Sequence, residues 1–261
     1  MTTETHAHTA RCWWNPDQAR WSCGAQPAEP STARPAEVPD AMDRPLVDVR
    51  DMLVVHTALL REFRLAPMAV TRTASGDRRR VAAVAAHLRF VCELLHHHHQ
   101  GEDALLWPPL RERAAPAAQR LIDEGETQHD GLDAALRRVG ELLEAWVETP
   151  DVGNRDGLAG HLGALHVLLR DHLEFEERVL LPLAAGVLTS GEWHAIGAAA
   201  AAAMPKPALA LAFGMFAYEG DPAVLRDMLR AAPAVPRLVL PRVAPRLYAR
   251  RARTIHGTAR P

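Results

Sequence analysis

Apolar residues recur at intervals of three and four over four long stretches of the chain, the spacing of an α-helix with one buried face. The stretches cover about residues 46–76, 77–108, 116–150 and 155–185. Their apolar positions include Leu53, Leu59, Phe63, Val84, Leu88, Leu132, Leu136, Leu165 and Leu169. No strand pattern competes with this period. Long helices joined by short loops predict an all-α fold, an up-down-up-down four-helix bundle.

Capping residues and prolines indicate where these helices begin and end. Asp77 can cap the second helix, and Pro108 with Pro109 ends it. The third helix is expected to begin near Pro116 and to stop at Pro150.

The chain is predicted to have three regions. Residues 1–45 lack periodicity and are expected to form a disordered or loosely docked N-terminal arm. Residues 46–186 form the bundle, and residues 187–261 form a helical C-terminal extension. The extension starts with a possible capping box from Thr189 to Glu192. Its basic, Pro/Arg-rich end is either a solvated, partly ordered tail or a segment that packs on the bundle, supports a dimer or touches an anionic partner.

A short motif occurs twice, near the ends of the second and fourth predicted helices. His98 and Glu102 form the first copy, and His172 and Glu176 form the second, 74 residues later. In each copy a second acid follows the glutamate, and a Leu-x-Pro sequence comes shortly afterwards. Residues four apart lie on one face of a helix, so each copy presents an imidazole and a carboxylate together. One such pair is commonly a surface pair, but two copies in matched apolar frames indicate ligands.

Each predicted hairpin contributes a further histidine from its first helix. His56 and His129 are 73 residues apart, and each is followed by a leucine three positions later. In an antiparallel bundle, His56, His98, His129 and His172 would all lie roughly 16 to 21 Å from the same end at 1.5 Å per residue. We therefore expect the four histidines to lie at one level.

Four histidines and two glutamates inside a bundle need a cation, because a buried carboxylate is costly without one. Imidazole together with carboxylate suits iron, manganese or zinc. The expected site has two metal ions with two histidines each, bridged by Glu102 and Glu176. This arrangement leaves positions for a bridging oxo or hydroxo group and for a small exogenous ligand.

Several neighbouring residues leave parts of this assignment open. His99, three positions before Glu102, is the alternative to His98, whereas His96 and His97 fall on other faces. Glu126, one turn before His129, could be an extra ligand or an orienting acid.

Two further pairs of residues are repeated 74 positions apart but lack the sequence spacing of the candidate metal ligands. Asp103 and Glu177 turn about 100° away from the preceding glutamates and are expected in surface or interhelical pairs. His87 and His161 are also 74 residues apart, and we interpret them as polar positions inherited with the repeat.

The six candidate ligands, and the Leu-x-Pro sequences after the two pairs, resemble the cation-binding domain of hemerythrin-like proteins. The resemblance covers residues 46 to about 186. It implies a four-helix bundle with a non-haem di-iron centre that binds dioxygen, nitric oxide or peroxide, or that senses iron or oxidants.

The sequence departs from the oxygen-carrying hemerythrin pattern. That pattern has two histidines one turn apart on the third helix, whereas Gly125 and Asp133 flank His129 at that spacing. It also ends with a histidine and an aspartate five positions apart, whereas His172 and Glu176 are four apart. A more symmetric site with four rather than five histidines favours the oxidised metal, and therefore favours peroxide chemistry or sensing over reversible oxygen carriage.

The composition of the chain limits the classes of partner and the compartment that we expect for the protein. A net formal charge of −2 argues against a protein that works by neutralising nucleic-acid phosphates. Only three cysteines are present, so a reducing cytoplasm is the expected compartment. The most apolar later segment, residues 195–217, is broken by Pro205 and Pro207 and is a poor membrane span. We expect a small diatomic or peroxide ligand and no nucleic-acid or membrane partner, and leave a homodimer open.

The first functional hypothesis is a di-iron protein that binds or senses dioxygen, nitric oxide or peroxide. The alternative is a di-iron enzyme with catalase-like, peroxidase or oxidase activity. A third hypothesis is an iron-handling or zinc-binding structural bundle, in which metal would stabilise the fold without a redox change.

Overall fold

The computed structural model describes residues 12–15, 20–23, 46–230 and 232–261, and the chain divides into two units, residues 1–42 and 43–261. In the first unit, β1 (Cys12–Asn15) and β2 (Arg20–Cys23) pair antiparallel, with Cys12 opposite Cys23 in the backbone register. The sequence pattern did not predict these strands. The prediction of a disordered or loosely docked arm concerns residues 1–45. Apart from β1 and β2, these residues lie outside the described ones.

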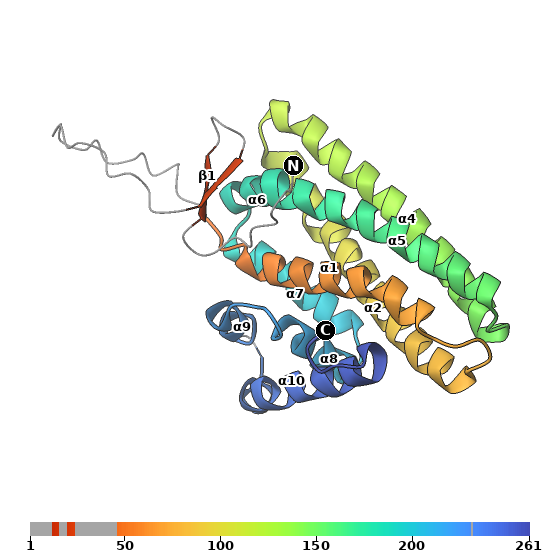
Figure 1. The fold of residues 1–261 in the computed structure, drawn as a ribbon. Coiled ribbons are helices and arrows are strands. Elements are labelled where there is room, and N and C mark those ends of the chain that lie inside the picture. The colour runs from red at the N-terminus through yellow and green to blue at the C-terminus, as the bar shows by residue number, and fades with distance from the viewer. Residues whose placement is uncertain (1–11, 16–19, 24–45, 231) are drawn as a thin grey trace, which may run out of the picture. The chain divides into compact units, whose positions relative to one another are not determined.

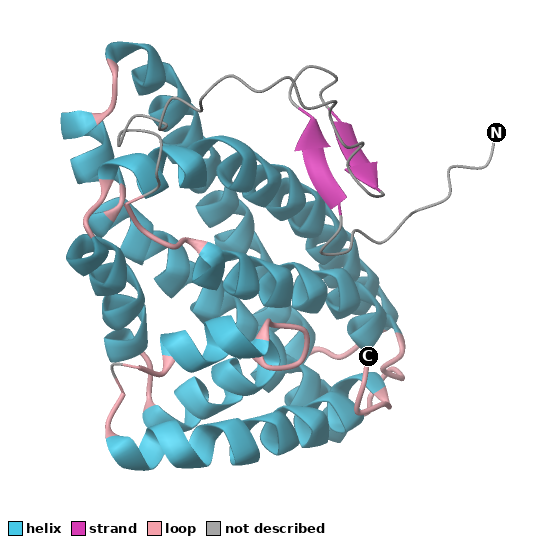
Figure 2. Ribbon diagram, turned by 90° about the vertical axis from the view of Figure 1, so that its left-hand side faces the viewer, coloured by secondary structure: helices cyan, strands magenta, loops and turns pink. Residues whose placement is uncertain are grey.

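Four long helices make up most of the second unit: α1 (Arg50–Thr71), α2 (Arg78–Leu105), α4 (Gln119–Glu148) and α5 (Val152–Phe175). Helix α1 packs against α2 and α5, and α4 packs against the same two helices (Figure 1). Each long helix therefore has two long neighbours, and the four surround one core. The described residues of this unit contain helices and no strand, so the predicted all-α class is confirmed for them (Figure 2).

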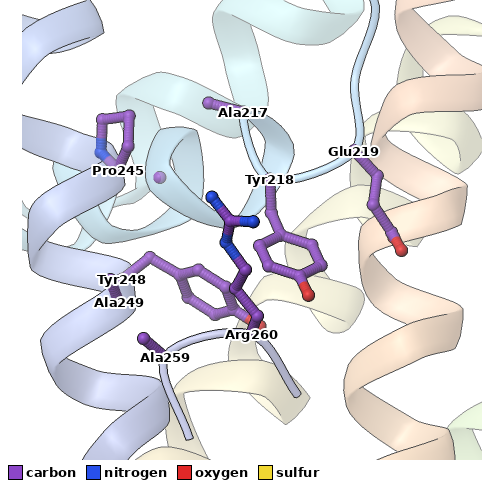
Figure 3. A pocket seen from close by; sticks show the side chains of 9 residues that line it. Ala217, Tyr218, Glu219, Pro245, Tyr248, Ala249, Ala259 and Arg260 are labelled. Carbon is purple, nitrogen blue, oxygen red and sulfur yellow. The ribbon is translucent and has the colours of Figure 1, made fainter.

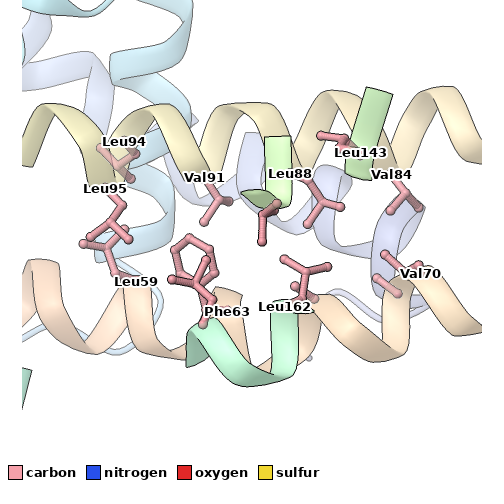
Figure 4. Packing of buried hydrophobic residues seen from close by; sticks show 14 of the residues in the cluster. Leu59, Phe63, Val70, Val84, Leu88, Val91, Leu94, Leu95, Leu143 and Leu162 are labelled. Atoms are coloured by element: carbon pink, nitrogen blue, oxygen red, sulfur yellow. The ribbon is translucent and has the colours of Figure 1, made fainter. Parts of the chain in front are cut away.

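The core follows the helical period seen in the sequence. Leu59 and Phe63 of α1 point toward Val91 and Leu95 of α2 (Figure 4). All four side chains are buried. Burial of a side chain of this size contributes about 1.5 to 3 kcal/mol, so this layer stabilises the packing of α1 on α2.

Helix ends agree with the capping signals. The Asp77 side chain accepts a hydrogen bond from the Arg80 backbone N–H at 2.9 Å, which makes it the N-cap of α2. Helix α2 ends at Leu105, and a short helix, α3 (Trp107–Arg113), follows with two prolines in its first turn. A 3₁₀ turn, η2 (Pro116–Ala118), then leads into α4.

The predicted fourth helix, residues 155–185, is divided into three parts. Helix α5 ends at Phe175, a π-helical turn η3 (Glu176–Leu180) follows, and α6 (Leu181–Val187) completes the segment. Pro182 has no N–H for the carbonyl four residues earlier, and its ring crowds that carbonyl, so the α-helical hydrogen-bond pattern is interrupted at this point.

The C-terminal extension contains α7 (Ser190–Ala203), α8 (Lys206–Phe216), α9 (Pro222–Met228) and α10 (Ala234–His256). The predicted capping box is present, with Thr189 and Glu192 bonding each other's backbone N–H. Helix α7 packs on α2, while α8 and α9 contact α1 and α10 packs mainly on α8 (Figure 1). Gly214 permits the close approach of α8 to α10, because an added Cβ would collide with the Ala244 carbonyl.

The sequence left open whether the basic C-terminal segment is a solvated tail or packs on the rest of the chain. In the structure this segment forms helix α10, which packs on α8. It continues through Pro241 and Pro245. Its buried residues, Ala244, Tyr248, Ala252 and Ile255, supply the tertiary contacts that offset the lost backbone hydrogen bonds. Among the helices described, none is both long enough and apolar enough to span a bilayer.

Candidate metal centre

The structure brings all six predicted ligands together inside the bundle. Helix α1 supplies His56, α2 supplies His98 and Glu102, and α4 supplies His129. Helix α5 supplies His172, and Glu176 is the first residue of the π-helical turn. No side chain of the six is more than 7% exposed. The i, i+4 spacing and the hairpin repeat therefore predicted a real convergence.

The Nε2 atoms of the four histidines face the two carboxylates. Glu102 lies between two of them, with Oε1 3.6 Å from His98 Nε2 and Oε2 3.7 Å from His129 Nε2. Glu176 is near three of them: Oε2 is 3.5 Å from both His56 Nε2 and His172 Nε2, and Oε1 is 3.7 Å from His129 Nε2. These separations exceed ordinary hydrogen-bond lengths and leave space for a cation between the atoms.

None of these facing atoms has a hydrogen-bond partner among the described residues. The unpartnered buried atoms are Nε2 of His56, His98, His129 and His172 and both carboxylate oxygens of Glu102 and Glu176. Burying a polar atom without a partner costs about 1 to 3 kcal/mol, and more when it is charged. Eight such atoms aimed at one small volume fit metal ligation, which satisfies every one of them.

The Nδ1 atoms of His56, His129 and His172 do have partners. His129 Nδ1 lies 2.7 Å from Asp103 Oδ1, and His56 Nδ1 lies 3.0 Å from Glu177 Oε1. When Nδ1–H donates to a carboxylate, the tautomer leaves the Nε2 lone pair free for a metal. Asp103 and Glu177 thus form the interhelical pairs that the sequence predicted.

These two hydrogen bonds link the hairpins reciprocally. Asp103 belongs to the first hairpin and orients the histidine of the second, while Glu177 belongs to the second hairpin and orients the histidine of the first. Asp103 and Glu177, the second acids of the two motif copies, therefore each lie beside a histidine of the candidate centre.

His99 joins the cluster as well, which the sequence treated as an alternative to His98 and not as an addition. Its side chain is buried, and neither ring nitrogen has a partner among the described residues. Its ring stacks on His129 with centroids 4.3 Å apart, and it lies 5.3 Å from the His172 ring. Consecutive helical residues point about 100° apart, so the sequence gives no indication that His98 and His99 reach the same site. Both reach it because α2 packs against both α1 and α4.

Gly125 lies one turn before His129, at one of the two positions where a second histidine of this helix was considered. A Cβ at Gly125 would lie 2.7 Å from Leu180 Cδ1 and 3.3 Å from the Trp107 ring. Leu180 and Trp107 therefore fill the space that a side chain at this position would need.

The donor atoms fall into two groups of metal-binding size. His56, His98, Glu102 and Glu176 form one, and His99, His129 and His172 form the other. In each group the donor atoms lie within 4.8 Å of one another. Glu102 and Glu176 also approach His129 of the second group, so both carboxylates lie between the groups.

Burial lowers the pKa of three histidines of this cluster, whereas the neighbouring Asp103 and Glu176 carboxylates outweigh burial and raise the pKa of His129 to about 10. Burial and the neighbouring histidines lower the pKa of His98 and His99 well below the usual value, and burial lowers the pKa of His172 to about 4. These rings are consequently neutral, as a ligand must be. Burial and the nearby Glu176 raise the pKa of Glu102 well above its usual value. A metal cation would remove that penalty by compensating the charge.

A family comparison agrees with this geometry. Residues 47–184, more than half of the chain, match the model of the hemerythrin HHE cation-binding domain. The chain belongs to this family. No curated protein and no solved structure matches the chain.

Other candidate residues lie outside the centre of the hemerythrin domain. Glu126 binds Arg111 on the surface, with Oε2 2.6 Å from Nη2, so the structure does not place it as a ligand. His96 is exposed, and His97 lies 3.8 Å from Glu93. His161 is exposed and bonds only the Gly157 carbonyl.

A second buried cluster joins the hemerythrin domain to the extension. Glu62 of α1 has Oε2 3.0 Å from His87 Nε2 of α2 and 3.7 Å from His256 Nε2 of α10. Its Oε1 accepts hydrogen bonds from the Tyr248 hydroxyl at 2.5 Å and from Arg61 Nη2 at 3.1 Å. His87 is therefore more than an inherited polar position, because it binds a buried carboxylate.

The charge of Glu62 is balanced within this second cluster. Burial would raise the pKa of Glu62, but the neighbouring His256 and His87 outweigh it and hold that pKa well below its usual value. Arg61, also buried, bonds Glu219 at 2.8 Å on its other side. The carboxylate thus has protein partners on both oxygens.

A pocket of about 610 Å³ lies next to the second cluster, away from the six ligands, and Tyr218, Tyr248 and Arg260 are among its lining residues (Figure 3). The Tyr218 hydroxyl donates to the Pro261 carbonyl at 3.1 Å. The hollow is an open cleft between α8, α10 and the C-terminal residues.

Proposed function

We propose that the hemerythrin domain holds two iron ions and binds or senses dioxygen, nitric oxide or peroxide. The observation that carries this proposal is the set of buried, unpartnered imidazole and carboxylate atoms facing one another inside the bundle. A structural polar network would be expected to satisfy these atoms with protein donors and acceptors.

The proposed ligands follow the two groups of donor atoms. His56 and His98 bind one ion, and His129 and His172 bind the other, with Glu102 and Glu176 shared between them. His99 is the proposed third histidine of the second ion, which makes the centre less symmetric than the sequence predicted. The same convergence supports an up-down-up-down course for α1, α2, α4 and α5.

Protein groups define how such a centre would work. Bound iron would supply a redox change and a coordination position for a small ligand. Asp103 and Glu177 hold two of the imidazoles in the ligating tautomer. Trp107 packs beside the His129 ring, and Leu180 fills the space at Gly125 one turn earlier, so these two side chains exclude water from that side. The sparse cysteines of the described helices are consistent with the reducing cytoplasm that we propose as its compartment.

A second candidate is a di-iron enzyme that turns over peroxide. Two shared carboxylates and a fully buried centre favour the oxidised metal, which is the observation that supports this alternative. Zinc in place of iron, with stabilisation of the fold and no redox change, would indicate a structural bundle instead.

The first test is the metal content of the protein after expression with iron, with an absorption spectrum before and after peroxide. About two irons per chain with near-ultraviolet bands that respond to peroxide would support the proposal. Steady consumption of peroxide, lost in Glu102→Ala, would favour the enzyme. A single zinc, or no bound metal, would contradict both.

A further inference from the structure

The outward face of α10 is apolar over much of its length. The opposite face packs inward through Ala244, Tyr248 and Ala252. The exposed aliphatic residues of the outward face are Val235, Leu238, Val239, Val243 and Leu247, and they are 42 to 71% exposed. Most lie three or four residues apart and therefore form one continuous stripe along the helix.

Arginines lie along the same helix and form no ion pair with an acid of the described residues. Helix α10 has six arginines and no acidic residue, so its formal charge is +6 in a chain of net charge −2. Arg242 donates only to the Leu238 carbonyl at 2.8 Å, and Arg246 donates to the Arg242 carbonyl. Elsewhere, exposed arginines such as Arg138, Arg170 and Arg178 form ion pairs with neighbouring acids. Among the described ion pairs, none includes an arginine of α10.

We infer that α10 is a docking surface for anionic lipid and lies flat on a membrane. A helix with exposed aliphatic residues and unpaired arginines on one face matches the interface of an anionic bilayer, where the aliphatic groups enter the acyl boundary and the guanidinium groups bind the headgroups. The earlier expectation of no membrane partner rested on the lack of a membrane span, which a surface helix does not require.

Charge and composition favour this occupant over two others. A second copy docked through the same face would place arginines opposite arginines, which is unfavourable. A nucleic acid would bind the arginines but would leave five exposed aliphatic residues without an apolar partner.

The test measures co-sedimentation of the full-length protein with phosphatidylcholine vesicles, with and without about one-third phosphatidylserine, a composition rich in anionic lipid. The first variant, R242Q/R246Q/R250Q, removes three charges from the face. Each basic residue near an anionic surface contributes about fivefold to binding, so we expect a loss on the order of 100-fold. The second variant, V239S/V243S/L247S, keeps the charge and is expected to lose binding to the same vesicles because the apolar contact is removed.

The matched control is R138Q/R170Q/R178Q, which removes three exposed charges from the bundle and should bind vesicles as the wild type does. Circular dichroism and thermal unfolding verify that each variant is folded. The inference is supported by salt-sensitive binding to anionic vesicles alone, lost in both α10 variants. It is overturned if the wild type does not bind anionic vesicles, if the control loses as much binding as R242Q/R246Q/R250Q, or if V239S/V243S/L247S binds anionic vesicles undiminished. It is also overturned if V239S/V243S/L247S loses self-association but keeps vesicle binding, or if the wild type binds duplex DNA more tightly than the anionic vesicles and V239S/V243S/L247S keeps that DNA binding.

Discussion

Two clusters of histidine and glutamate are buried in this molecule, and they treat their carboxylates in opposite ways. Glu62 has hydrogen bonds or close histidines on both oxygens, supplied by Tyr248, Arg61 and His87. Glu102 has close histidines but no hydrogen bond from any described residue. Both carboxylates are buried beside histidines, so the hydrogen-bond donors Tyr248 and Arg61, present only beside Glu62 among the described contacts, separate the two clusters.

The difference teaches how a ligand set is distinguished from a structural network. In the cluster around Glu62, neighbouring side chains neutralise and solvate the carboxylate, and His256 and Tyr248 tie α10 to the bundle. In the cluster around Glu102 and Glu176, the Nε2 atoms and carboxylate oxygens face one another without a hydrogen bond among the described residues, and a cation between them would satisfy these atoms.

The largest expected effect separates the clusters by metal content. Glu102→Ala should reduce bound iron at least tenfold, because a shared carboxylate is lost from the centre. Glu62→Ala should keep the metal content of the wild type in the folded fraction. Elemental analysis of purified, folded protein measures both. Glu126→Ala is the control, since that acid binds Arg111 on the surface; equal metal loss in all three variants would contradict the comparison.

The repeat makes a sharper prediction within the centre. His98→Ala and His172→Ala should lose similar amounts of metal, because the two hairpins contribute equivalent pairs. His97→Ala should keep a nearly normal content, and His99→Ala should lose metal if His99 binds the second ion. Full metal in His98→Ala together with loss in His99→Ala would show that the predicted register is wrong.

Glu62→Ala, which should leave the metal content unchanged, should instead lower the free energy of unfolding. Glu62→Ala leaves Arg61 buried without its neighbour, which typically costs about 3 to 5 kcal/mol in the free energy of unfolding. Urea denaturation of the metal-free protein measures this change. Glu219→Ala is the matched control, because Glu219 is a partly exposed partner of the same arginine, and its removal should cost less than about 1 kcal/mol.

Removal of the orienting acids should have a smaller effect on the centre. Asp103→Asn and Glu177→Gln should each weaken metal binding by about 10- to 100-fold, since such hydrogen bonds fix the tautomer and direction of a ligating histidine. Competitive titration with a chelator gives the affinities. Glu174→Gln serves as the control because Glu174 pairs with Arg178 on the surface, and unchanged affinity in both orienting variants would refute the assigned role.

The smallest effect concerns pH. The pKa of Glu62 is lowered in the folded protein from its ordinary value of 4.5. Between the folded and unfolded pKa values the unfolded chain binds more protons, so stability from this group is complete above about pH 4.5 and is lost as the pH falls. The stability difference between wild type and Glu62→Gln should therefore shrink below that pH, by at most about 1.4 kcal/mol per pH unit. A difference that grows on acidification would contradict the assignment.

The sequence by itself determined the long helices and the convergence of four histidines and two glutamates. Apolar residues with a helical period can be buried in only one way, and histidine and glutamate four apart must share a helix face. Asp77 and the capping box at Thr189 were readable for the same reason, since capping depends on residues within one turn.

Tertiary structure alone decided the features that depend on distant segments. His99 reaches the centre because α2 lies between α1 and α4, and its neighbour in sequence gives no sign of this. Glu62, His87 and His256 meet from three separate helices, which no local spacing encodes. Helix α10 persists through its prolines because packing on α8 compensates the lost hydrogen bonds. Local periodicity specifies which face of a helix is buried, whereas the partners of that face are set by the packing of the whole chain.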